Sequence, residues 1–200
     1  ATLTGTQTNF AQVLNLVREA GYLKKKPSFY IIRLIAISLI ASALWTGAGF
    51  LAWAATDNRW WMILAFALVA LLGVMSAQYG FIAHEAAHRQ IFRNNKLNDW
   101  TGLILANLFA GLSYGFWLRK HNKHHQKPNQ IDADPDIAIR ILSFTVESRD
   151  QKRGIERWMS NRQGYLFPFL LFLTGFDLLL DSVGGMGRKD RSLGIRILEF

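Results

Sequence analysis

The stretch IIRLIAISLIASALWTGAGFLAWAATDNRWWMILAFALVALLGVMSAQYGFIA, residues 31–83, decides the fold because it holds two long apolar runs. The runs cover residues 31–55 and 60–83, and charged side chains are almost absent inside them. A helix needs roughly 20 apolar residues to cross about 30 Å of hydrocarbon, so each run is long enough to span a membrane. The short TDNR link between the runs predicts an antiparallel helical hairpin.

The residues that flank these runs predict their orientation in the membrane. Trp53, Trp60 and Trp61 cluster at the predicted turn, as an aromatic belt at a membrane surface does. The other end of the hairpin carries the KKK run at 24–26, and it also receives Arg89, Arg93 and Lys96. The positive-inside rule makes this end cytoplasmic and accounts for the net charge of +9, so we expect no nucleic-acid partner. The chain has no cysteine, which excludes thiolate metal ligands.

Four further segments complete the predicted fold. Residues 8–23 are predicted to form an amphipathic helix with Thr8 as N-cap. The apolar run at 101–117 is marginally short for crossing the membrane, so we expect it to be re-entrant or to lie in the membrane interface. Its G-x-x-x-G motif predicts close helix packing. Residues 137–162 suggest cytoplasmic helices, and the apolar run at 164–180 is a third span. We therefore predict an all-α integral membrane protein with one domain, incomplete at its C-terminus: an interfacial helix (1–28), a transmembrane hairpin (29–83), a cytoplasmic histidine region (84–163), and a span with its tail (164–200).

All five histidines lie in two short clusters, HEAAH at 84–88 and HNKHH at 121–125. The spacings i, i+4 and i, i+3, i+4 put each cluster on one face of a helix. Each cluster directly follows an apolar run, so both are expected at the same membrane boundary. Imidazole nitrogen is a good ligand for iron, zinc, copper and nickel. The candidate metal ligands are therefore His84, His88, His121, His124 and His125.

Two classes of protein other than a redox metalloenzyme are also compatible with these histidines. HEAAH alone is the zinc-protease pattern, in which Glu85 would act as general base beside two histidine ligands. That interpretation leaves two histidines of the second cluster unused, and Glu85 could instead orient an imidazole. A membrane scaffold without catalysis, with vestigial histidines, is the other alternative.

The two clusters and their surroundings resemble the membrane-bound fatty acid desaturases, and bacterial acyl-lipid or acyl-CoA desaturases in particular. HEAAHRQIF is similar to the first histidine box of that family, and HNKHH followed by PNQIDADPDI is similar to its second box and downstream loop. The resemblance implies a histidine-ligated, non-haem di-iron centre with two Fe, O2 as co-substrate and electrons from an external donor. It implies a fatty acyl substrate (acyl-CoA or acyl-lipid), membrane lipid, and an electron-donor protein such as a ferredoxin or cytochrome with its reductase. Its product is an acyl chain with a new cis double bond.

Further residues have expected roles under this resemblance. Glu85, Asn129, Asp134 and Asp136 are expected to orient the metal-binding histidines. Aromatic residues beside the boxes are candidates to line an acyl tunnel: Phe81, Tyr114, Phe116 and Trp117. Basic residues near the boxes are candidates to meet an anionic head group, a CoA phosphate or an acidic electron donor, although positive-inside topology explains most of them: Arg89, Arg93, Arg119, Lys120 and Lys123.

The sequence departs from the family pattern after the second box, since no histidine follows His125. The third histidine box of the family is therefore missing. We expect this chain to be a fragment of a longer desaturase or a degenerate relative, with partial metal loading and no turnover by itself. A different histidine-box oxygenase, such as a lipid hydroxylase or ketolase, has the same first two boxes and remains an alternative.

Overall fold

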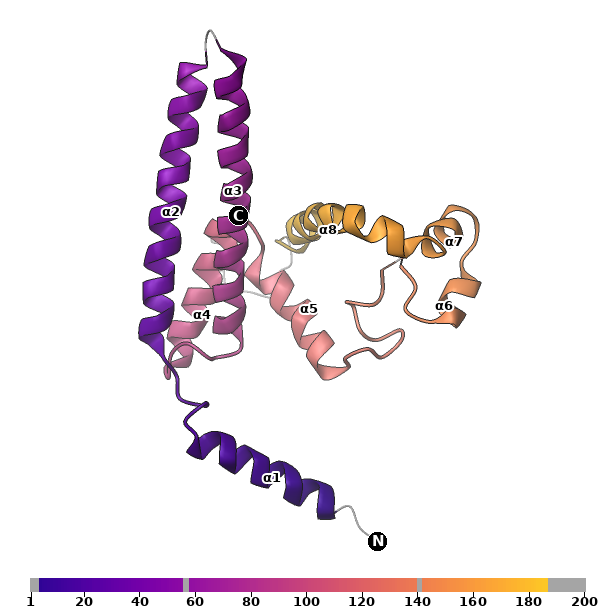
Figure 1. The fold of residues 1–200 in the computed structure, drawn as a ribbon. Helices are drawn as coiled ribbons and strands as arrows, with labels where there is room; N and C mark the ends of the chain where they lie inside the picture. Colours follow the sequence, from indigo (N-terminus) through magenta and orange to yellow (C-terminus); the bar gives the residue numbers. More distant parts are fainter. Residues whose placement is uncertain (1–3, 56–57, 140–141, 187–200) are drawn as a thin grey trace. The chain divides into compact units, whose positions relative to one another are not determined.

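A computed structural model describes residues 4–55, 58–139 and 142–186, and these residues form helices joined by turns and loops (Figure 1). The helices that follow the N-terminus are α1 (Thr4–Glu19), α2 (Pro27–Ala54) and α3 (Arg59–Ala87). The middle of the chain holds α4 (Asn95–Ile104), the π-helix η1 (Leu105–Phe109) and α5 (Tyr114–Gln126). The last elements are α6 (Val146–Gln151), α7 (Gly154–Ser160) and α8 (Gln163–Met186). The predicted all-α class is confirmed for the described residues.

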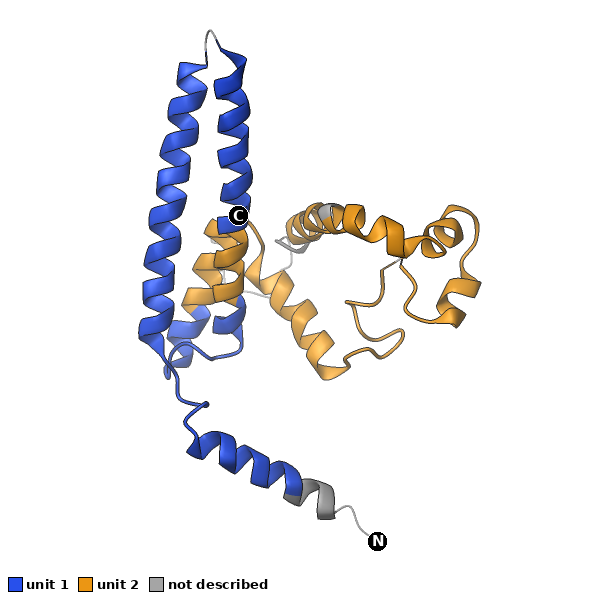
Figure 2. Cartoon of the chain, in the orientation of Figure 1, with its two compact units in different colours: residues 1–75, 84–99 blue, residues 76–83, 100–200 orange. Residues whose placement is uncertain are grey.

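The chain divides into two compact units (Figure 2). Unit 1 contains residues 1–75 and 84–99, and unit 2 contains residues 76–83 and 100–200. Helices α3 and α4 each contribute residues to both units. The first histidine cluster belongs to unit 1 and the second to unit 2.

Helices α2 and α3 form the predicted hairpin and lie side by side in Figure 1. Both are long and apolar enough to cross a membrane. Pro27 opens α2 at a position where its missing N–H costs nothing, and the Asn58 side chain caps α3 by accepting a hydrogen bond from the Trp60 N–H at 3.0 Å. Most apolar side chains of α2 are exposed, with Ile37 and Ala48 as its buried residues. An exposed apolar surface of this kind fits a lipid environment.

Helix α2 begins before its predicted start, α3 extends beyond both of its predicted limits, and α1 is displaced toward the N-terminus. Helix α3 continues through the first histidine cluster to Ala87. Helix α1 begins before Thr8, so Thr8 lies inside the helix and the predicted N-cap was wrong. The helix ends at Glu19 because Gly21 adopts φ +78°, which stops a right-handed helix. Residues 56–57 of the predicted turn and the predicted tail beyond residue 186 lie outside the described residues.

The segment after the first histidine cluster, for which residues 101–117 were predicted to be re-entrant or to lie in the interface, is bent. The pair formed by Asn95–Phe109 and Tyr114–Gln126 bends by 116°, as in a broken span or a re-entrant loop. Gly111 has φ +69° in the break and no atom within 4 Å of its Cβ position, so it serves the bend, and the predicted close packing was wrong at this glycine of the G-x-x-x-G motif. The close approach occurs at Gly102 instead, where a Cβ atom would overlap the ring of Tyr114.

Helix α8 corresponds to the predicted third span. It is bent by 55° between Gln163–Leu171 and Leu173–Gly184. Counting each bent pair as one span, the described residues offer up to four candidate spans, and otherwise two. The predicted helices within 137–162 are the short α6 and α7.

Candidate metal centre

The first histidine cluster sits at the C-terminal end of α3. His84 lies in the last turn and His88 is the C-cap, with ring centroids 4.6 Å apart. Arg89 then adopts φ +59°, and the Gln90 N–H donates to the Glu85 carbonyl oxygen at 3.1 Å. This geometry is a Schellman motif that fixes the chain direction directly after the cluster.

Glu85 has a partner on α2. The Tyr30 hydroxyl donates to Glu85 Oε2 at 3.3 Å. This bond joins the two helices of the hairpin next to the first cluster. The carboxylate therefore has a structural role here, and the prediction that it orients an imidazole has no support from this contact.

The loop after the first cluster is held by Asn98, a role that was not predicted from the sequence. Asn98 is fully buried. Its Oδ1 accepts from the Phe92 N–H at 3.0 Å, and its Nδ2 donates to the carbonyl oxygens of Phe92 at 2.8 Å and Asn94 at 3.1 Å. Nearby, Arg89 Nη1 lies 2.6 Å from an Asp99 carboxylate oxygen. A polar residue in a polar stretch carries no pattern that would have revealed this role.

The second histidine cluster occupies most of α5. The helix begins at a capped position, because Ser113 accepts from the Phe116 N–H at 3.2 Å and the Tyr114 N–H donates to Asn107 Oδ1 at 2.8 Å. Further along the helix, His121 Nε2 and His125 Nε2 lie 3.1 Å apart. The helix therefore brings these two ring nitrogens close together, as the i, i+4 spacing predicted.

Trp117 supports the first ring of this pair. It stacks on His121 with 4.5 Å between ring centroids and an interplanar angle of 18°. The stack restricts the rotation of that imidazole. This finding gives Trp117 a different role from the predicted lining of a tunnel.

His124 is oriented by a buried carboxylate. Its Nδ1 lies 3.0 and 2.9 Å from the two carboxylate oxygens of Asp134, whose side chain is fully buried. A hydrogen on Nδ1 that bonds to a carboxylate leaves Nε2 as the nitrogen that can bind a metal. Asp136 also approaches, with one oxygen 3.5 Å from the same Nδ1.

Backbone N–H groups hold Asp134 in place. The N–H of Asn129 donates to it at 2.7 Å and the N–H of Asp136 donates at 2.9 Å. Burial raises the pKa of the Asp134 carboxyl, but the hydrogen bonds from Asp136, Asn129 and His124 outweigh burial and lower its pKa below the ordinary value. The carboxylate is therefore ionised at neutral pH. Asn129 contributes through its backbone, in a left-handed conformation with φ +59°, and not through its side chain.

The chemistry of these side chains fits a histidine-bound metal. Three imidazoles lie within two turns of α5, two of them with converging nitrogens and one fixed by a carboxylate. In addition, His124, Asp134 and Asp136 each offer an atom within 4.8 Å of the others. Imidazole ligands with a carboxylate behind the ring are the usual arrangement around iron and zinc in proteins.

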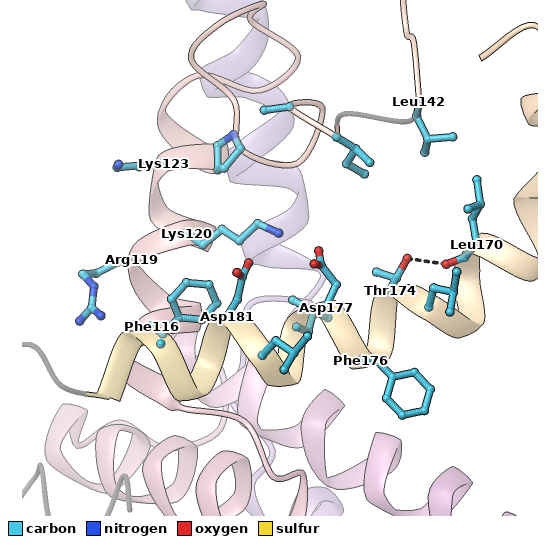
Figure 3. A pocket seen from close by; sticks show the side chains of 17 residues that line it. Phe116, Arg119, Lys120, Lys123, Leu142, Leu170, Thr174, Phe176, Asp177 and Asp181 are labelled. Atoms are coloured by element: carbon cyan, nitrogen blue, oxygen red, sulfur yellow. Dashed lines mark hydrogen bonds between the residues drawn. The ribbon is translucent and has the colours of Figure 1, made fainter. Parts of the chain in front are cut away.

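Unit 2 also contains a cavity of about 990 Å³ beside α5 (Figure 3). Arg119, Lys120 and Lys123 line it from α5, and Asp177 and Asp181 line it from α8, with apolar side chains between them. Arg119 and Lys123 lie on the face of α5 that points away from His121 and His125, whereas Lys120 lies one turn before His124, and both of these contact Asp136. The cavity is therefore amphipathic.

The four predicted tunnel aromatics have different environments. Phe116 lines this cavity. Tyr114 is buried against Gly102, and Phe81 is exposed on α3. Trp117 stacks on His121, as described above. Of the four predicted tunnel aromatics, Phe116 is therefore the one that lines the cavity.

Comparison with known proteins identifies a family whose match includes both histidine clusters. Residues 59–192 match the fatty acid desaturase family. This segment includes both histidine clusters and covers more than half of the chain. The chain belongs to the fatty acid desaturase family, a family of oxidoreductases, and the predicted resemblance is confirmed.

Several curated desaturases are similar to parts of the chain. A delta 8-(E)-sphingolipid desaturase of Komagataella phaffii is 39% identical over 46% of this chain and 16% of its own length. A delta(6)-fatty-acid desaturase of Caenorhabditis elegans is 29% identical over 67% of this chain and 28% of its own length. A delta(8)-fatty-acid desaturase of Euglena gracilis is 32% identical over 53% of this chain and 26% of its own length. The chain thus spans less than a third of each relative, and no solved structure matches it.

Proposed function

We propose that this chain carries the first two histidine boxes of an O2-dependent fatty acyl desaturase that introduces a cis double bond. The observation that supports this most directly is the ordered imidazole set on α5, where His124 is fixed by Asp134 and the Nε2 atoms of His121 and His125 converge. Family membership supplies the fatty acyl substrate class and the expectation of iron.

In this proposal, His84, His88, His121, His124 and His125 bind a non-haem di-iron centre. Iron held by these residues would supply the oxidising chemistry with O2 by which two hydrogens are removed from neighbouring carbons of the acyl chain. With two electrons and two protons from outside the chain, one O2 yields two molecules of water. We expect the electrons to come from a donor protein such as a ferredoxin or cytochrome with its reductase.

The residues of the chain would position the ligands and the substrate. Asp134 holds the Nδ1 hydrogen of His124 and so presents Nε2. Trp117 limits the rotation of His121. The apolar wall of the α5–α8 cavity suits an acyl chain, while Arg119, Lys120 and Lys123 suit an anionic carrier. The two candidate spans at α2 and α3 make this a membrane protein, and the positive-inside rule puts the histidine boxes on the cytoplasmic face.

The contact of Glu85 favours this function over a zinc protease. A general base needs its carboxylate directed at the metal-bound water, whereas Glu85 accepts a hydrogen bond from Tyr30 on α2. Lipid hydroxylation or ketolation by the same boxes remains the closest alternative. We further propose that the 200-residue chain by itself binds less iron than a complete centre and is inactive.

Metal analysis and product analysis test the proposal together. The full-length protein is purified from its membrane and its metal content is measured, and lipids of an expressing host are analysed for new double bonds. We expect about two iron atoms per protein and a new cis double bond. Near-stoichiometric zinc without iron would contradict the proposal, as would a hydroxylated product without a double bond.

A further inference from the structure

A second cavity lies in unit 1, where the chain leaves α1 and enters α2. It has a volume of about 610 Å³ and is lined by residues 20–26, 29 and 30 together with residues 88–90. We propose that this cavity, which borders the candidate metal ligand His88, binds the phosphate of an anionic phospholipid. The proposal goes beyond the desaturase function and does not depend on it.

The walls of the cavity are built by two helix ends. Residues 20–22 follow α1, where Gly21 has φ +78° and the Tyr22 N–H donates to the Val17 carbonyl oxygen at 3.2 Å. Residues 88–90 follow α3 and form the equivalent Schellman motif described above. Lys25 joins the two walls, because its Nζ donates to the Phe92 carbonyl oxygen at 2.8 Å. The cavity is therefore a built feature of unit 1.

The charge of the cavity is strongly positive. Lys24, Lys25, Lys26 and Arg89 line it. Each of the two helix C-termini contributes about half a negative charge, and Asp99 pairs with Arg89, so an excess of positive charge remains. Within the described residues, neither Lys24 nor Lys26 makes an ion pair. These two ammonium groups are the ones available to a phosphate.

The position of the cavity identifies the anion as a lipid head group. Pro27, the first residue of the candidate span α2, directly follows the lysines, so they lie at the depth where phospholipid phosphates lie. Leu23 and Phe29 on either side of the lysines are more than half exposed. A phospholipid provides both the phosphate for the lysines and the acyl chains for these apolar side chains.

Native mass spectrometry of the detergent-solubilised full chain tests this assignment. Short-chain phosphatidylglycerol is titrated against wild type, the double variant Lys24→Gln/Lys26→Gln and the charge-retaining variant Lys24→Arg/Lys26→Arg. We expect the Gln variant to lose on the order of tenfold or more in affinity for the first lipid, since each basic residue near an anionic surface contributes several-fold. The Arg variant should remain close to wild type.

A matched control separates the cavity from general positive charge. Lys96→Gln/Lys127→Gln removes two lysines that do not line the cavity, and its lipid affinity should remain within about twofold of wild type if the cavity and not net charge binds the lipid. Equal losses in the control and in the cavity variant would overturn the proposal, and so would unchanged binding by the cavity variant. Inorganic phosphate at millimolar concentration should displace less than half of the lipid, and full displacement would overturn the assignment to a phospholipid. Circular dichroism of each variant establishes that the helices remain folded.

Discussion

The carboxylate of Asp134 lies 2.9 Å from Nδ1 of His124, and it is fully buried although the loop around it is exposed. Two backbone N–H groups and one imidazole direct their hydrogens at this carboxylate, so it is fixed from three sides. It links the loop after the second histidine box to the face of α5 that carries the candidate ligands. This link is the basis of the first two predictions.

Asp134→Asn should weaken iron binding by the full-length protein about 10- to 100-fold, because an amide no longer fixes the Nδ1 hydrogen of His124. Asp132→Asn is the matched control: it lies in the same loop, is exposed, and adopts φ +62°, which asparagine tolerates well. Iron per protein after dialysis against graded chelator measures the effect. Equal iron retention by both variants would show that Asp134 does not act on the metal site.

The stability that Asp134 provides should depend on pH in the metal-free protein. Its folded-state pKa is lowered, so its contribution is fully present above the unfolded value of about 3.9 and is lost as the pH falls through the folded value. The difference in unfolding free energy between wild type and Asp134→Asn should therefore stay constant from pH 8 to about pH 5 and shrink below about pH 4. Denaturant unfolding in detergent at several pH values measures this difference. A difference that grows on acidification would contradict the lowered pKa.

Asn98→Ala should destabilise the loop after the first box by about 2–4 kcal/mol, since it removes three hydrogen bonds and leaves the Phe92 N–H without its partner. Asn95→Ala changes an exposed asparagine at the start of the same helix and should have little effect. Thermal unfolding in detergent compares the two variants. If they lower the midpoint equally, the buried side chain of Asn98 does not hold this loop.

The sequence predicted the features that depend on local spacing. Apolar runs of span length predicted α2 and α3, and the i, i+4 spacing predicted the converging nitrogens of His121 and His125. The break between η1 and α5 was not predictable in detail, because it depends on a contact between Asn107 and the Tyr114 N–H. The roles of Trp117 and Asn98 also depend on contacts that no periodic pattern encodes.

The roles of two glycines also depend on contacts that local spacing does not reveal. Spacing alone pointed to Gly111 as a packing glycine, whereas its φ of +69° shows a turn. The close approach is at Gly102, whose neighbour Tyr114 is twelve residues away in the sequence. A glycine can serve either a positive φ in a turn or the close approach of another group, and only its contacts in the folded protein show which applies.

Gly102→Ala should destabilise unit 2 by about 1–3 kcal/mol, because the new methyl group would overlap the ring of buried Tyr114. Gly73→Ala is the opposite case, since nothing lies within 4 Å of its Cβ position in α3, and alanine there should stabilise the helix by about 0.5–1 kcal/mol. Unfolding of both variants in the same detergent gives the comparison. Stabilisation by Gly102→Ala would show that Tyr114 does not pack against this position.

The decisive substitutions for function are His84→Ala and His124→Ala in the full-length protein, one in each histidine box. If both boxes bind the same di-iron centre, either change should abolish formation of the double bond, while insertion into the membrane persists because the spans α2 and α3 are unchanged. Asn122→Ala is the matched control, because Asn122 is exposed on α5 between the histidines and should leave product formation near wild type. Gas chromatography of host lipids measures the product, and protease protection of the membrane fraction measures insertion. Product formation that survives either histidine change would remove that residue from the metal site, and loss of product in the control would show that any change on α5 disturbs the enzyme.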